Sequence, residues 1–124
     1  MFNFFKNLGL ENPNISLTKD VLFYGKNTDY NVMKLATAIF KRALQKSNKR
    51  ISFEEISSEN SNLDLFVKLE FAANFNALKN TITNFSNRKY PIPDSQVQKT
   101  AENTFEMLVN NTVQEIKKKK KINY

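Results

Sequence analysis

The densest apolar stretch of the chain runs from Leu63 to Phe85, and eleven of the sixteen residues from Leu63 to Leu78 are Leu, Val, Phe or Ala. A helical period places the apolar side chains on one continuous stripe that further apolar residues widen. The stripe consists of Phe71, Phe75, Leu78, Ile82 and Phe85, and the residues that widen it are Phe66, Leu69, Ala72, Ala73 and Ala77. This interpretation predicts a central helix that is buried on most sides.

A strand over residues 63–71 is the competing interpretation, because apolar and polar side chains nearly alternate there. Such a strand would pair with the residues before it as a hairpin over 51–71, and the fold would be α+β. The helix has the better start, since Ser61 and Asp64 have the spacing of a capping box and Asn62 is a rival cap. We therefore predict an all-α fold, with α+β as the alternative.

Two other segments have a helical period without a competing one. Tyr30 to Lys46 forms an amphipathic helix that Asn27 or Thr28 can cap, and the last helix opens at Asp94 or Ser95. The apolar face of the first is Val32, Ala36, Ile39, Phe40, Ala43 and Leu44, and that of the second is Val97, Ala101, Phe105, Leu108, Val109, Val113 and Ile116.

Shorter helices are expected elsewhere in the chain. Apolar residues within 2–8 suggest a short amphipathic helix, and a second one is expected from a cap at Ser16 to Gly25. Ser52 and Glu55 have the spacing of a capping box, which predicts one or two helical turns through Ser57.

A chain of 124 residues is long enough for one hydrophobic core. We predict a single helical domain over residues 1–116, in which three main helices pack together with short N-terminal helices on one side, followed by a basic, frayed tail over 117–124. The predicted core residues are Val32, Ala36, Ile39, Phe40, Ala43, Phe66, Leu69, Ala73, Phe75, Leu78, Ile82, Phe105, Leu108 and Val109.

The positive charge is concentrated near the C-terminus. The net charge is +7, but Lys117 to Lys121 supply five charges and leave 14 basic against 12 acidic side chains. A second basic region follows from the absence of any acid between residues 30 and 53. The candidate contacts to an anionic partner are Lys41, Arg42, Lys46, Lys49, Arg50, Lys117, Lys118, Lys119, Lys120 and Lys121.

Several chemistries have no support in the sequence. The chain has no His or Cys and only two Gly, so zinc sites, the common nucleophile and base pairs, and glycine-rich cofactor loops are not expected. The segment from Gly25 to Thr28 only faintly matches a phosphate loop, and its expected role is to end one helix and cap the next. The acids between Glu54 and Asp64 are expected to sit near helix starts. We predict no catalytic residue, metal site or cofactor.

The function expected by elimination is non-enzymatic binding of another protein, as in an inhibitor, an antitoxin-like protein or an immunity-type partner. The alternative is a nucleic-acid-binding accessory protein that uses the lysine tail and the basic patch. The sequence contains no 18-residue uncharged run that could span a membrane, and Lys6 interrupts the apolar start, so no secretory signal is expected. These features predict a cytoplasmic protein.

Overall fold

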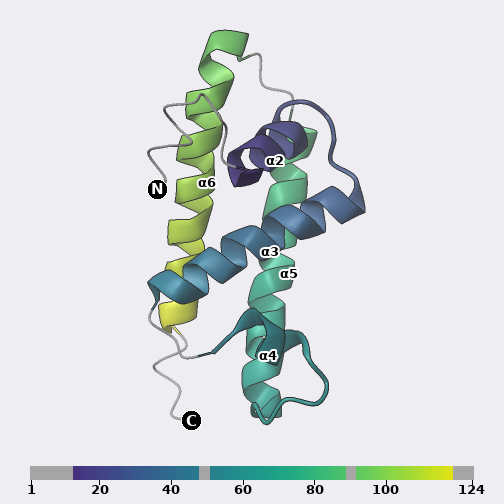
Figure 1. Cartoon of the computed structure of the whole chain (residues 1–124), viewed down its shortest axis with the longest axis vertical. Helices are drawn as coiled ribbons and strands as arrows, with labels where there is room; N and C mark the ends of the chain where they lie inside the picture. Colours follow the sequence, from purple (N-terminus) through teal and green to yellow (C-terminus); the bar gives the residue numbers. More distant parts are fainter. Residues whose placement is uncertain (1–12, 48–50, 89–91, 119–124) are drawn as a thin grey trace.

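The computed structural model describes residues 13–47, 51–88 and 92–118, and in these ranges the regular structure is entirely helical (Figure 1). The helices are α2 (Pro13–Leu22), α3 (Asp29–Lys46), α4 (Phe53–Ser57), α5 (Leu65–Asn87) and α6 (Asp94–Lys118). The all-α prediction is confirmed, and the alternative hairpin over 51–71 is wrong. The short helix predicted within residues 2–8 lies outside the described residues.

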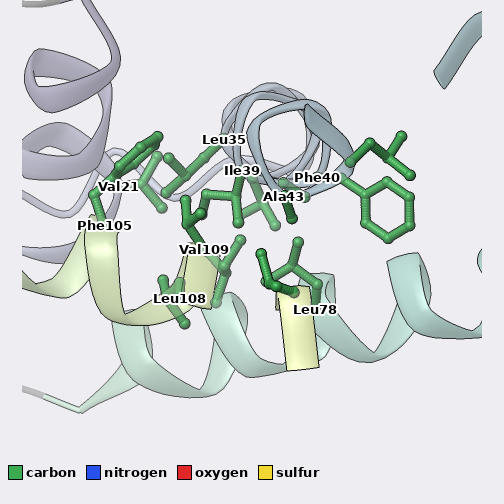
Figure 2. Close-up of a cluster of buried hydrophobic side chains, with 14 of the residues drawn as sticks. Val21, Leu35, Ile39, Phe40, Ala43, Leu78, Phe105, Leu108 and Val109 are labelled. Carbon is green, nitrogen blue, oxygen red and sulfur yellow. The ribbon is translucent and has the colours of Figure 1, made fainter. Parts of the chain in front are cut away.

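α5 and α6 lie side by side and run in opposite directions, and α3 crosses both of them (Figure 1). α2 contacts α3, α5 and α6, and α4 packs against α3 and the start of α5. Figure 2 shows the core between these layers, with Ile39 and Ala43 of α3 above Val109 of α6 and Leu78 of α5. The core is thus the space between the crossing helix and the antiparallel pair.

α3 is the most deeply buried helix of the described chain. Thr28 caps its start by accepting a hydrogen bond from the backbone N–H of Asn31 at 3.2 Å, as one of the two predicted caps. Its buried stripe recurs at helical spacing and consists of Val32, Leu35, Ala36, Ile39, Phe40, Ala43 and Leu44. α3 and α5 each contact all four other described helices, but five side chains of α3 are fully buried and only Ile82 of α5 is. α3 therefore holds the place that the sequence assigned to the Leu63–Phe85 segment.

α5 is helical as predicted, but it is not buried on most sides. Only one narrow stripe faces the core, formed by Val67, Phe71, Leu78 and Ile82. Phe75 is half-buried, whereas the predicted core residues Phe66, Leu69 and Ala73 are exposed, so their assignment to the core is wrong. The physical reason is that packing on the α3 layer needs one stripe, and in the described chain no element covers the opposite side.

The N-cap of α5 also differs from the expected one. Asp64 itself caps the helix, because its Oδ1 accepts from the backbone N–H of Phe66 at 2.8 Å. The proposed box of Ser61 with Asp64 is not formed, and the Ser61 hydroxyl donates instead to the backbone oxygen of Glu55 at 2.6 Å.

The other helix ends agree in part with those predicted from the sequence. The capping box of Ser52 with Glu55 is confirmed at the start of α4. α2 begins at Pro13 and not at Ser16, which suits proline because the first helical position needs no N–H donor. Gly25, with φ of +73°, follows α2 in a left-handed conformation that glycine adopts at little cost.

α6 begins at Asp94, one of the two expected starts, and continues to Lys118, two residues beyond the predicted domain end. Gln98 in the first turns of α6 has two contacts: its Oε1 accepts from Lys19 at 3.0 Å and its Nε2 donates to Glu102 at 3.3 Å. The first of these bonds joins α2 to α6.

An aromatic cluster joins three helices. The fully buried ring of Phe40 in α3 packs edge to face with Phe53 of α4 at 6.1 Å and with Phe71 and Phe75 of α5 at 6.2 and 5.7 Å between centroids. Such pairs contribute about 0.5–1.5 kcal/mol each beyond area burial. Phe40 is therefore the aromatic residue whose loss should matter most.

We expect Phe40→Ala to lower the free energy of unfolding by about 3–5 kcal/mol, because it removes a fully enclosed ring from the core. Phe66→Ala is the matched control, and it should cost less than about 1 kcal/mol because that ring is exposed. Chemical denaturation of both variants at low protein concentration measures the difference. Equal losses would show that Phe66 is as buried as Phe40.

Candidate interaction surface

The fully exposed residues of α5 are all uncharged. We call this set the exposed α5 face, and its residues are Leu65, Phe66, Leu69, Ala72, Ala73, Asn76, Ala77, Asn80, Thr81, Thr83, Asn84 and Asn87. The three charged residues of the helix, Lys68, Glu70 and Lys79, are each partly buried and lie outside this set. Glu70 nevertheless follows Phe66 by four residues and precedes Ala77 by seven, so only the fully exposed residues of this side are all neutral.

The first turns of the exposed α5 face are apolar as well as neutral. Leu65, Phe66 and Leu69 are 65%, 71% and 56% exposed and share one side of the helix. Single exposed apolar residues are common on protein surfaces, but a contiguous exposed apolar group often marks an interaction site.

The other long helices present ordinary solvated surfaces. The exposed residues of α3 include Asp29, Lys34, Lys41, Arg42 and Lys46. The exposed residues of α6 include seven charged side chains: Asp94, Lys99, Glu102, Glu106, Glu115, Lys117 and Lys118. Since depletion of charge distinguishes the centre of protein interfaces from the rest of the surface, α5 differs from α3 and α6 in the direction expected for an interface.

A shallow groove lies between α5 and α6 beside the exposed α5 face, with a volume of about 400 Å³. Its lining is mostly amide, hydroxyl and apolar, and consists of Asn74, Ala77, Leu78, Thr81, Leu108, Asn111, Thr112, Gln114 and Glu115. The buried Nδ2 of Asn74 has no hydrogen-bond partner among the described residues.

The basic residues predicted as anion contacts mostly link helices. Lys41 of α3 pairs with Glu54 of α4 at 3.2 Å. Lys46 of α3 lies 3.8 Å from the carboxylate of Glu106 and donates to Asn110 at 2.9 Å, both on α6. Arg42 contacts Gln45 of its own helix at 3.5 Å. The charges of Lys41 and Lys46 are thus already balanced by acids of this chain.

The remaining predicted contacts lie at the end of α6 or beyond it. Lys117 and Lys118 are exposed there, and Lys118 pairs with Glu115 at 3.2 Å. Lys49, Arg50 and Lys119 to Lys121 lie outside the described residues. The described basic residues among these predicted contacts therefore support nucleic-acid binding less than the exposed α5 face supports protein binding.

The acids that follow the basic region have structural roles. Glu54 pairs with Lys41, Glu55 completes the capping box of α4, and Asp64 caps α5. Among the described residues, no group of three or more acids could hold a metal ion.

The Gly25–Thr28 segment likewise serves the fold. Asn27 Nδ2 donates to Ser86 Oγ at 3.1 Å, and Thr28 caps α3. The segment thereby ties the link between α2 and α3 to the last turn of α5, as well as ending one helix and capping the next.

Comparison with models of known protein families found no match, and neither did comparison with curated protein sequences or with solved structures. None of the helices in the described ranges combines the length and the apolar character that a membrane span requires.

The exposed α5 face was missed in the sequence because its apolar residues were assigned to the core. The signal was nevertheless present: at helical spacing, Asn76, Asn80, Thr83 and Asn84 continue the side that begins with Leu65. Four polar residues in succession along one side indicate that this side meets water or a partner.

The pKa of Glu54 is lowered, mainly because Lys41 donates a hydrogen bond to its carboxylate, with smaller effects from a backbone hydrogen bond and the lysine charge. A carboxyl with a lowered pKa in the folded state stabilises the fold at pH above the ordinary glutamate range, and this contribution is lost as the pH falls through the lowered pKa.

We expect Lys41→Met to return the pKa of Glu54 toward its ordinary value, as measured by an NMR titration of the side-chain carboxyl. Arg42→Met is the matched control, because it also removes one α3 cation but no contact to Glu54, and it should leave that pKa lowered. A Glu54 that titrates normally in the unmodified chain would contradict the Lys41–Glu54 pair.

Proposed function

We propose that this protein acts by binding another polypeptide through the exposed α5 face and the adjoining groove between α5 and α6. The observation that carries the proposal is the exposure of Leu65, Phe66 and Leu69 side by side on a well-packed helix. Burial of such side chains on a partner contributes about 25 cal/mol per Å² of apolar surface, which gives this face a driving force for association.

Two further features support the proposal. None of the residues of the exposed α5 face is charged, and Glu115 is the charged residue in the lining of the groove, so binding requires few ions to lose their hydration. The groove beside it is lined by amide and hydroxyl side chains that can form the few hydrogen bonds an interface of this kind carries.

The mode of action we propose is steric. A small helical body that covers a surface of its partner is sufficient for an inhibitor, an antitoxin-like protein or an immunity-type protein, because each works by occupying a site. The helix itself is the contact element, as in recognition between a helix and a groove.

We expect Phe66→Asp to abolish retention of a stoichiometric polypeptide when the tagged chain is used as bait in an extract of the cells that produce it. The substitution places a charge in the centre of an apolar contact, where it loses hydration without gaining a partner. Asn84→Asp is the matched control, since it adds the same charge to the same helix away from the apolar turns.

The unmodified chain and Asn84→Asp should retain the same polypeptide, and circular dichroism should show all three chains equally helical. A polypeptide that Phe66→Asp retains as well as the unmodified chain would place the contact on another surface and overturn the proposal.

A further inference from the structure

We infer that residues 51–63, which include α4, detach from α3 and α5 as one unit while α2, α3, α5 and α6 stay packed. We call this segment the α4 strap. Its release uncovers Leu44 and the rings of Phe40 and Phe75, which the strap contacts in the closed form. The contacts that carry the inference lie outside the exposed α5 face, so it goes beyond the proposed function and does not depend on it.

The α4 strap contributes no buried residue to the fold. Each of the other described helices supplies at least four buried residues, including the ten-residue α2. The apolar side chains of the strap are only partly buried against the core, and they are Ile51, Phe53, Ile56 and Leu63. A segment with so little buried apolar surface opens at a lower free energy than the core.

Most hydrogen bonds of the α4 strap are internal, so they can move with it. Ser52 and Glu55 form the capping box of α4, and the Ser61 hydroxyl donates to the backbone oxygen of Glu55 at 2.6 Å. The Ser57 hydroxyl donates to the backbone oxygen of Phe53 at 3.1 Å. Detachment of the strap as a unit therefore breaks none of these bonds.

Among the described residues, two polar contacts join the α4 strap to other helices. Lys41 of α3 pairs with Glu54 at 3.2 Å, and the two side chains are 49% and 71% exposed. Lys68 of α5 donates to the backbone oxygen of Ser58 at 2.9 Å. Because exposed ion pairs contribute little to stability, apolar contact is the main attraction that keeps the strap in place.

The apolar contact under the α4 strap is incompletely packed. The Phe53 ring lies 6.1 Å from that of Phe40 and 5.4 Å from that of Phe75 between centroids. Beside it, a pocket of about 200 Å³ lies between the strap and α3, and its lining is Lys41, Leu44, Gln45, Ile51, Ser52, Phe53 and Glu54. Core contacts are normally close-packed, so the pocket lowers the attraction between the strap and α3.

The helices on both sides of the α4 strap are capped without it. Ser47 follows α3, and its backbone N–H and its hydroxyl donate to the backbone oxygens of Ala43 and Leu44, each at 2.9 Å. Asp64 caps α5 with its own carboxylate. Detachment of the strap therefore leaves both helices, and the hydrogen bonds of their amides, in place.

Thiol labelling tests whether the α4 strap opens by itself. The chain has no cysteine, so a single-cysteine variant reports on one position. Leu44→Cys places the thiol beside the strap. Leu35→Cys is the matched control, because Leu35 is fully buried on the same stripe of α3 and does not line the pocket under the strap. The labelling rate of each folded variant is divided by its rate in strong denaturant.

We expect Leu44→Cys to label at least about tenfold faster than Leu35→Cys on this scale. Low concentrations of urea should barely change the rate for Leu44→Cys, because release of the strap exposes little surface, and should raise the rate for Leu35→Cys, which needs global unfolding. Equal rates with equal urea dependence would overturn the inference. Labelling of Leu44→Cys as fast as in denaturant would also overturn it, because the strap would not cover this position.

Two charge substitutions in the otherwise unmodified chain give an independent test. Ile56→Asp places a carboxylate in the apolar contact of the α4 strap, and Asn60→Asp adds the same charge to an exposed strap residue. Circular dichroism should show Ile56→Asp nearly as helical as the unmodified chain, with one cooperative unfolding transition, because only the strap is released. Loss of the whole fold in Ile56→Asp would show that the strap belongs to the cooperative core and overturn the inference.

The same substitutions combine with the labelling measurement. Added to Leu44→Cys, Ile56→Asp should raise the labelling rate at least about tenfold, because it destabilises the closed strap, and Asn60→Asp should leave the rate unchanged. Equal effects of the two substitutions would overturn the inference, since the labelling would then not depend on the apolar contact of the strap.

Discussion

The side chains of Leu35, Ile39, Phe40 and Ala43 turn one face of α3 into the surface on which the other helices rest (Figure 2). Each of these side chains is fully buried, and together they fill the space between α3 and the antiparallel α5–α6 pair. Hydrophobic burial is the dominant favourable term in folding. Helices as short as α2 and α4 are not stable alone, so they depend on apolar surface buried against the continuous stripe on α3. The buried Phe40 ring extends this contact to α4.

The position of α3 determines what remains exposed. Since α3 crosses the α5–α6 pair on one side, α5 packs through a single narrow stripe, and its opposite side keeps the apolar residues Leu65, Phe66 and Leu69 at the surface. Two charged residues of α3 lie at the contacts with α4 and α6, where Lys41 and Lys46 pair with Glu54 and Glu106. The fold thereby leaves exposed charged residues on α3 and α6 and exposed uncharged residues on α5.

The sequence predicted the helices well because capping chemistry and helical period are local properties. Thr28, the box of Ser52 with Glu55, and the start at Asp94 all agree with it. It could not rank the helices by burial, because burial depends on which sides of a helix meet another element. Density of apolar residues made Leu63–Phe85 look central, although the stripes of α3 and α6 are more fully buried. The same error hid the candidate surface, since Phe66 and Leu69 were counted as core.

Native-state hydrogen exchange at low protein concentration tests most directly whether α3 is the element on which the fold depends. If it is, the backbone amides from Leu35 to Leu44 exchange only through global unfolding, with the largest free energies of opening in the chain. The first turns of α5 pack on the core through Val67 and Phe71 only, so their amides exchange with smaller free energies of opening. Greater protection in those turns of α5 than in α3 would contradict the account.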